Sequence, residues 1–291
     1  MANSEMGAKC VLITGGTDGL GKAAALLLAE RGYRVFAAGR SAERRAQLDS
    51  VTRERRLPLE TLEMDVCDDA SVRQAVAEVL RKTGRIDVLV NNAGVAYVAC
   101  VEDMCIEDWR RQFEINFFGA IRVTQAVLPQ MRERRSGRLL LMSSISGLVT
   151  PPTQAAYSGS KHAMEALGNA LRHELCPFGI RTVLIEPGYI VTGIQQAAVD
   201  LAQPYMERIK SGPYARVYET AWAGAKASRA ASKTTAEDCA RIMLKAIEAP
   251  NPKARYGVTP LARAVKWSKR LLPDSLIDAQ IRRRYGIIRE N

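Results

Sequence analysis

The feature that most constrains the fold is an alternation of short apolar runs with helical patterns over the first two-thirds of the chain. The runs are typical of buried strands and comprise residues 8–14, 33–38, 60–65, 86–90, 139–142 and 181–186. Helices are predicted at 22–31, 43–56, 68–84, 106–135 and 156–175, with a bend near Gly119 in the fourth. This order favours an α/β fold, a parallel doubly wound sheet with helices on both faces. No repeat or flexible linker interrupts it, so we expect one domain over 1–291.

A glycine-rich turn, TGGTDGLG, joins the first strand to the first helix. Gly15, Gly19 and Gly21 permit a tight turn, a close backbone approach and close packing of the helix. The helix start offers unpaired N–H groups and the positive end of its dipole, which suit a pyrophosphate. The alternative is a glycine turn without a ligand. The residues assigned here to a dinucleotide are Gly15, Thr17, Asp18, Gly19, Leu20 and Gly21.

Tyr157 and Lys161 lie four residues apart in a predicted helix, with Ser144 thirteen residues upstream of the tyrosine. That spacing places both side chains on one helical face. A neighbouring ammonium favours the phenolate, so it lowers the pKa of a phenol from its reference near ~10. The pair therefore predicts a proton donor and acceptor, although a tyrosine–lysine pair at this spacing also occurs by chance.

Five motifs together resemble the short-chain dehydrogenase/reductase family in its single-domain branch. They are the GxxxGxG turn, Asn91-Asn-Ala-Gly94, Ser144, Tyr157-x-x-x-Lys161 and Pro187-Gly188, and they span roughly residues 8–195. The resemblance implies a Rossmann-type sheet of about seven strands, a nicotinamide cofactor, and interconversion of a secondary alcohol and a ketone or aldehyde.

The resemblance implies four catalytic residues. Ser144, chosen over Ser143 by its spacing, orients the substrate oxygen, and Tyr157 exchanges a proton with that oxygen while the nicotinamide C4 transfers hydride. Lys161 lowers the tyrosine pKa and holds the nicotinamide ribose. Asn116 holds a helix distortion and an ordered water that links Lys161 to solvent; a purely structural asparagine is the alternative.

The resemblance also assigns residues along the remainder of the cofactor. Asp65, with Val66, follows the third strand and meets the adenine amino group, unless it only starts the next helix. The group after the fourth strand lines the adenine–ribose side, and the group after the sixth covers the nicotinamide. These two groups are Asn92, Ala93 and Gly94, and Pro187, Gly188, Ile190 and Thr192.

The end of the second strand indicates the type of cofactor. An acidic residue usually binds the ribose 2′-hydroxyl here, but the sequence has Gly39 followed by Arg40. An arginine can bind a 2′-phosphate through two hydrogen bonds, which favours NADP(H) over NAD(H). Asp18 is a departure, because many NADP-using relatives carry a basic residue at that point. It could instead bind a ribose hydroxyl or cap the helix.

The C-terminal part carries the charge asymmetry of a chain whose net charge is +11. Residues 253–291 form a basic extension in which Leu261, Val265, Trp267 and Leu272 are spaced for an amphipathic helix that Pro273 ends. It either packs on the domain or a partner subunit, or makes a peripheral contact with an anionic membrane. No recognition motif supports nucleic acid as a partner.

Residues 189–235 lack the strand–helix rhythm and carry several aromatic residues, which suggests either an irregular substrate lid or surface helices on the core. Six cysteines without paired spacing and two histidines argue against a metal site and favour a reducing, cytoplasmic setting. The resemblance implies a small-molecule substrate and a homodimer or homotetramer. The C-terminal tail loosely resembles that of relatives with lipophilic substrates, so we expect a lipophilic one here. The alternative functions are a non-catalytic redox sensor or scaffold on the same fold and, less consistent with the turn spacing, a nucleotide-sugar epimerase.

Overall fold

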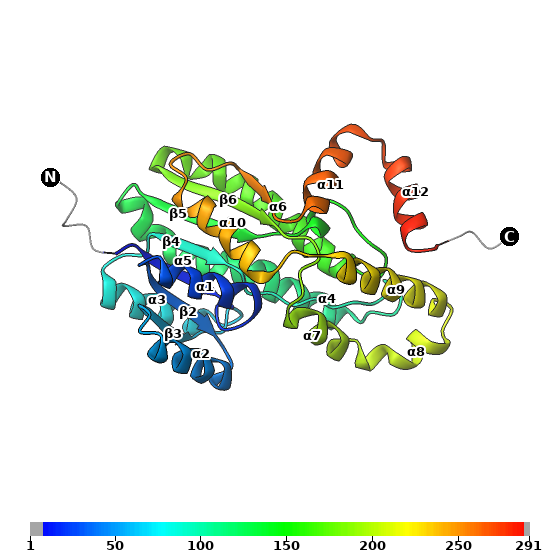
Figure 1. Cartoon of the computed structure of the whole chain (residues 1–291), viewed down its shortest axis with the longest axis horizontal. Coiled ribbons are helices and arrows are strands. Elements are labelled where there is room, and N and C mark those ends of the chain that lie inside the picture. The colour runs from blue at the N-terminus through cyan, green and yellow to red at the C-terminus, as the bar shows by residue number, and fades with distance from the viewer. Residues whose placement is uncertain (1–7, 288–291) are drawn as a thin grey trace.

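A computed structural model describes residues 8–287, apart from the side chains of residues 195 and 196. Seven parallel strands form one sheet in the order β3-β2-β1-β4-β5-β6-β7 (Figure 1). The strands are β1 (Cys10–Thr14), β2 (Arg34–Gly39), β3 (Leu59–Glu63), β4 (Val88–Asn91), β5 (Gly137–Met142), β6 (Ile180–Glu186) and β7 (Arg255–Gly257). The predicted Rossmann-type fold is confirmed.

Helices cover both faces of the sheet because its strands are apolar on both sides. In β1, Cys10 and Leu12 belong to one core cluster and Val11 and Ile13 to the other, as the two-residue period of a strand requires. Helices α3, α5 and α6 cover the first face, and α1, α2 and α10 cover the second. Their bounds are α1 (Gly19–Glu30), α2 (Ala42–Glu54), α3 (Asp69–Thr83), α5 (Gly119–Glu133), α6 (Ala155–Glu174) and α10 (Ala236–Glu248).

The predicted helix at 106–135 is interrupted before Gly119 rather than at it. Helix α4 (Ile106–Phe113) continues through a π-helical turn, η1 (Glu114–Phe118), into α5. Such a turn adds a residue to the helix and turns side chains away from the regular period, and it is frequent at functional sites. Asn116 lies in this turn.

The segment after β6 is helical, as the surface-helix interpretation expects, and a role as substrate lid is compatible with that. It contains α7 (Gly193–Leu201), α8 (Met206–Ser211) and α9 (Ala215–Ala231), which lie beyond the end of the sheet (Figure 1). Their core is a third apolar cluster centred on Tyr218, whose hydroxyl donates to Asp103 at 2.8 Å and accepts from the Cys100 amide at 2.8 Å.

Helix α10 and strand β7 are not among the elements located from the sequence, although Thr235 and Asp238 form a capping box at the start of α10. Helix α11 (Pro260–Leu271) matches the predicted amphipathic helix, and α12 (Asp274–Arg284) follows Pro273. Helix α12 returns toward the α9 region, where the Arg284 guanidinium donates to Ser228 Oγ at 2.6 Å (Figure 1). Among the described helices, none combines the length and apolarity needed to cross a membrane.

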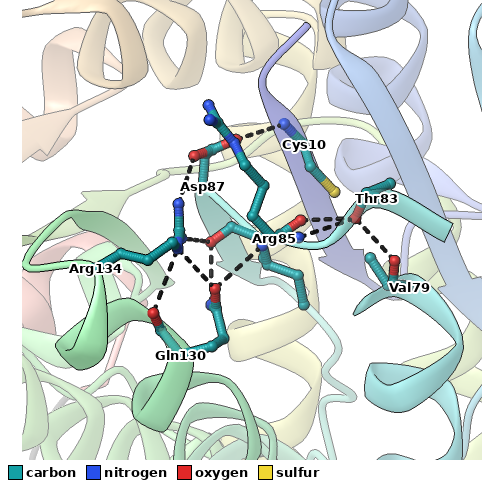
Figure 2. A network of polar contacts seen from close by, with 8 residues as sticks. Cys10, Val79, Thr83, Arg85, Asp87, Gln130 and Arg134 are labelled. Atoms are coloured by element: carbon teal, nitrogen blue, oxygen red, sulfur yellow. Dashed lines mark hydrogen bonds and ion pairs between the residues drawn. The ribbon is translucent and has the colours of Figure 1, made fainter. Parts of the chain in front are cut away.

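A network of polar contacts lies at the amino-terminal ends of the strands, a region called the amino edge below (Figure 2). Asp87, just before β4, accepts from the Cys10 amide at 2.8 Å, Arg85 Nε at 2.9 Å and Arg134 Nη1 at 3.1 Å. Gln130 and Arg134 also bind the backbone of Ile86, at 3.1 and 2.8 Å. These bonds tie α5 to the starts of β1 and β4 with their charges paired.

Candidate active site

A cleft of about 1160 Å³ opens at the carboxyl ends of the strands. Its floor includes Thr14 and Gly15 from the end of β1 and Asn92 and Ala93 from the end of β4. The strand order reverses between these two strands, and ligands of open α/β sheets bind at such a point. The sheet topology therefore places the cleft where the sequence predicts a dinucleotide.

Most of the predicted site residues meet in this cleft. Gly21 and Asn116 do not line it and lie behind its wall. The predicted residues that do line it are Gly15, Thr17, Asp18, Gly19, Leu20, Arg40, Asp65, Val66, Asn92, Ala93, Gly94, Ser144, Tyr157, Lys161, Pro187, Gly188, Ile190 and Thr192.

Two glycines of the turn, Gly15 and Gly21, have no room for a side chain. Gly15 has φ +61°, and a Cβ there would lie 2.9 Å from Ala93 Cα. A Cβ on Gly21 would lie 2.2 Å from the Gly15 carbonyl oxygen, so Gly21 packs α1 against the turn. Asn92 Nδ2 donates to that oxygen at 3.0 Å. Backbone without side chains therefore faces the cleft at the start of α1. Such a site fits a pyrophosphate.

Two arginines lie at the adenine end of the cleft, each beside a carboxylate. Asp18 caps α1, accepting from the Gly19 amide at 2.8 Å, and its other oxygen lies 3.0 Å from Arg44 Nη1. Arg40 Nη1 lies 3.7 Å from Asp65 Oδ2. The capping alternative for Asp18 is confirmed. Arg44 is a cleft residue that the sequence reasoning missed, although it stands one turn after Arg40.

Gly39 is fixed as a glycine by its neighbour. A Cβ at this position would lie 2.5 Å from Thr17 Oγ1, and Thr17 is buried. An aspartate or glutamate at 39 would clash unless the turn moved. The Thr17 side chain therefore disfavours at this position the acid that usually binds a ribose 2′-hydroxyl.

Tyr157 and Lys161 are on α6, and Ser144 follows β5. Lys161 Nζ lies 5.7 Å from the centroid of the Tyr157 ring and donates to the Met142 carbonyl at 2.7 Å. Ser144 forms a side-chain hydrogen bond with Tyr157, and its Oγ also accepts from the Ser146 amide at 3.0 Å. The serine, the phenol and the amine therefore lie side by side in the cleft.

Burial controls the pKa values of this group. It raises the pKa of Tyr157 above its ordinary value, an effect that the Ser144 hydrogen bond partly offsets. It lowers the pKa of Lys161 to about 8. The Lys161 amine is directed at the Met142 carbonyl, and burial is the main influence on the tyrosine pKa. That Lys161 lowers the tyrosine pKa stays a prediction. At pH 7 the phenol is protonated and the amine charged.

Asn116 is buried behind the cleft and joins two of its walls. Its Oδ1 accepts from the Val95 amide at 2.8 Å, and its Nδ2 donates to the Val95 carbonyl at 3.0 Å and to Ser160 Oγ at 3.2 Å. The π-helical turn therefore ties Val95, a cleft residue, to the helix of Tyr157 and Lys161.

The segment after β6 is supported from behind by the C-terminal region. The Pro187 carbonyl accepts from the Ile145 amide at 2.8 Å. A Cβ on Gly188 would lie 2.3 Å from the hydroxyl of Thr259, the N-cap of α11. Thr259 is a support that the sequence reasoning missed, since only the fold brings it here.

The other half of the cleft is built from the helices after β6 and from the C-terminal region. Trp222, Lys226 and Arg229 of α9 line it, together with Tyr189 and Tyr285. The hydroxyls of the two tyrosines lie 3.2 Å apart. The sequence indicated Tyr189 and Trp222 through their aromatic segment; the two cations and Tyr285 carried no local signal.

Known proteins share this architecture. The chain is 34% identical over 280 residues to the NADPH-dependent 3-dehydrocapnine reductase of Ornithobacterium rhinotracheale, which covers 92% of this chain and 94% of that protein. It is 38% identical to the 3-ketodihydrosphingosine reductase of Bacteroides thetaiotaomicron over 63% of this chain and 64% of that protein. Matches to vertebrate dehydrogenase/reductase SDR family member 7B proteins span 60–63% of their length.

A solved structure agrees. The short-chain dehydrogenase/reductase of Burkholderia phymatum, in complex with NAD, has a TM-score of 0.79 and 25% identity, over 96% of this chain and 97% of that one. The short chain dehydrogenase family profile matches residues 9–202, which include the glycine turn, Tyr157 and Lys161. The chain therefore belongs to the short-chain dehydrogenase/reductase family.

Proposed function

We propose that the protein is an NADP(H)-dependent oxidoreductase that interconverts a secondary alcohol and a ketone. The convergence of Ser144, Tyr157 and Lys161 in one cleft with the glycine turn carries this proposal. A sensor or scaffold would need only the turn and would not require an acid–base group beside it. Two relatives whose names describe reductases add support.

The chain's residues have distinct tasks in the proposed reaction. When bound, the nicotinamide supplies or accepts the hydride at the carbonyl carbon. Ser144 donates to the substrate oxygen and holds it beside Tyr157. The protonated phenol gives its proton to that oxygen during reduction, so the C=O bond becomes CH–OH, and takes it back during oxidation. Lys161 contributes positive charge and binds the ribose, while Asn116 fixes the helices and connects Lys161 to solvent through a water.

The preference for NADP(H) rests on the adenine end. Arg40 and Arg44 both line the cleft and are half-exposed, so each can turn toward a 2′-phosphate. The packing of Thr17 against Gly39 removes the competing acid. In this arrangement Asp65 binds the adenine amino group.

Residues 189–235 act as the substrate lid in this proposal, and the substrate is lipophilic. The lid half of the cleft carries the apolar side chains of Ile194, Val199, Met206 and Trp222, with Val98 opposite. Burying an alkyl chain there is favourable by about 0.8 kcal/mol per CH₂ group.

Purified protein tests the activity directly. A panel of alkyl ketones, steroids, retinoids and sugars is assayed with NADPH and NADH, following oxidation of the nicotinamide. We expect turnover with NADPH and lipophilic ketones. Tight NADPH binding without turnover of any ketone would favour the sensor alternative.

We also propose a homodimer or homotetramer formed through the helices that begin at Ile106 and Ala155. Exposed apolar side chains on the first of these, Ile106 and Phe118, are suited to such a contact. Light scattering of the wild type and Phe118→Lys tests it, since a monomeric wild type would exclude the assembly.

A cytoplasmic location remains our proposal and is supported by six free cysteines. The basic extension exposes Trp267 and Leu271 beside Lys266 and Arg270, which suits a peripheral contact with an anionic membrane. Co-sedimentation with phosphatidylserine vesicles, compared with neutral ones, tests that contact. Equal recovery in the two pellets would rule it out.

A further inference from the structure

Two cations of α9 face the substrate half of the cleft. Trp222, Ala225, Lys226 and Arg229 follow the spacing i, i+3, i+4 and i+7, which puts them on one helical face. All four line the cleft. The lid therefore presents one aromatic ring followed by two positive charges along about 10 Å of helix.

These cations have no counter-charge in the described part of the chain. No hydrogen bond or ion pair joins the Lys226 or Arg229 side chain to another described residue. The described carboxylates that line the cleft are Asp18 and Asp65, and both are beside arginines at the adenine end. Elsewhere, by contrast, Arg284 is bonded to Ser228. An anion entering the lid half would find two charged donors available.

Contacts along α9 and just after it tie this helix to Tyr285 and Tyr189, which also line the cleft. A Cβ on Gly224 would lie 2.8 Å from the ring of Tyr285, whose hydroxyl is 3.2 Å from that of Tyr189. Tyr189 in turn is close enough to Tyr157 to raise its pKa electrostatically. Ser232, just after α9, donates to the Tyr189 carbonyl at 2.6 Å.

We propose that Lys226 and Arg229 form an anion subsite and that the substrate is an amphiphile, a long-chain ketone or alcohol that carries an acidic group. The apolar side chains of the lid would hold the alkyl chain while the two cations bind a carboxylate, sulfonate or phosphate. This substrate class rests on the proposed oxidoreductase function and makes it more specific.

Paired substrates test the subsite. A long-chain γ-keto carboxylate and its methyl ester differ in the charge and in one methyl group, and kcat/KM is measured for each with NADPH. We expect the wild type to prefer the carboxylate by roughly 10- to 100-fold, the effect of a hydrogen bond to a charged group. Lys226→Met/Arg229→Met should bring the ratio close to one. Lys233→Met, a lysine just beyond α9 and outside the cleft, is the control and should keep the wild-type ratio.

Two kinetic results would overturn the subsite. One is an equal fall in kcat/KM for both substrates in the double variant. The other is a rise in the KM for NADPH without a change in the carboxylate-to-ester ratio, because the cations would then hold the cofactor.

A binding measurement separates this inference from the proposed activity. Calorimetry compares octanoate with octanamide on the full chain saturated with NADP⁺, in the wild type and the same variants. Tighter binding of octanoate, lost in Lys226→Met/Arg229→Met alone, supports the subsite even if no ketone is reduced. Equal binding of the two ligands overturns it even if ketones are reduced, while failure of all ketones would count against the oxidoreductase function only.

Discussion

Asp87 and Glu186 are largely buried carboxylates at opposite ends of the strands of one sheet, and they differ in their hydrogen bonds. Asp87, at the amino edge, accepts three hydrogen bonds from Cys10, Arg85 and Arg134 (Figure 2). Glu186, at the carboxyl end of β6, is fully buried. Its Oε1 lies 3.4 Å from Arg255 Nε, but neither of its oxygens has a hydrogen-bond donor among the described residues.

The difference extends to the whole of each edge. At the amino edge the polar groups satisfy one another and hold strands to a helix. At the carboxyl edge, Arg40, Arg44, Lys226 and Arg229 line a cleft with weak or no internal partners. The polar groups at the amino edge find their partners within the chain, whereas those at the carboxyl edge are available to bind ligands. Substitutions at the amino edge should therefore lower stability, and substitutions at the carboxyl edge should lower activity.

The largest expected effect is on catalysis at the carboxyl edge. Tyr157→Phe removes the proton donor but keeps the ring, so kcat should fall by about 10²–10⁴-fold. NADPH affinity should stay within a factor of about two, because the phenol hydroxyl is assigned to the substrate. Turnover and fluorescence titration with NADPH measure the two. Activity within fivefold of the wild type would contradict the acid–base role.

Breaking the amino edge should instead cost stability. Asp87→Ala leaves the Cys10 amide and two guanidinium groups without their acceptor, and the free energy of unfolding should fall by about 2–4 kcal/mol. Asp87→Asn keeps part of the bonding and should cost less. Urea denaturation measures both variants. If Asp87→Ala lowers kcat under conditions in which the protein stays folded, the two edges are not independent.

Glu186 should make stability depend on pH. Burial, and then the nearby charge of Glu165, raise its pKa to about 7, against the opposing effects of Lys266 and Arg255. A raised pKa favours the folded state at low pH, and this contribution is lost as pH rises through about 7. Between pH 4.5 and 7 the loss should approach 2–3 kcal/mol, at about 1.4 kcal/mol per pKa unit.

Glu186→Gln removes that titration. Thermal unfolding from pH 5 to 8 should show a flatter profile for the variant and greater stability than the wild type at pH 8. Glu219→Gln, on the exposed face of α9, serves as a control with the wild-type slope. Parallel profiles for wild type and Glu186→Gln would place the proton elsewhere.

The smallest effect concerns cofactor choice. Arg40→Asp introduces a carboxylate where a 2′-phosphate is expected, so the ratio of kcat/KM for NADPH to that for NADH should fall about tenfold. Arg44→Ala should lower it less, because it removes a positive charge without introducing a carboxylate. An unchanged ratio in both variants would remove the phosphate role from these arginines.

The first six strands and the glycine turn could be predicted because their signals are local. A run such as Cys10–Thr14 is buried throughout, and a glycine turn is constrained by its own backbone. Strand β7 has three half-buried residues and lacks both the apolar run and the alternation that identify a strand.

Other parts of the site depend on contacts between distant residues. Arg44 meets Asp18 across 26 positions, Tyr285 meets Tyr189 across 96, and Gly188 packs on Thr259 only after β7 has joined the sheet. Likewise, the raised pKa of Tyr157 comes from burial in the folded protein, which neighbouring sequence does not specify. Residue types alone therefore predicted groups that the fold brings together in the cleft, but not how the fold adjusts them.

The position of Tyr285 in the chain also matters for biosynthesis. The glycine turn and Tyr157 leave the ribosome well before Thr259 and Tyr285, which complete the wall around them. A nascent chain that has just finished β6 would hold its acid–base groups in a basin open to water. Substitutions in the last third of the protein can therefore change which molecules enter the cleft, while the part that is synthesised first stays the same.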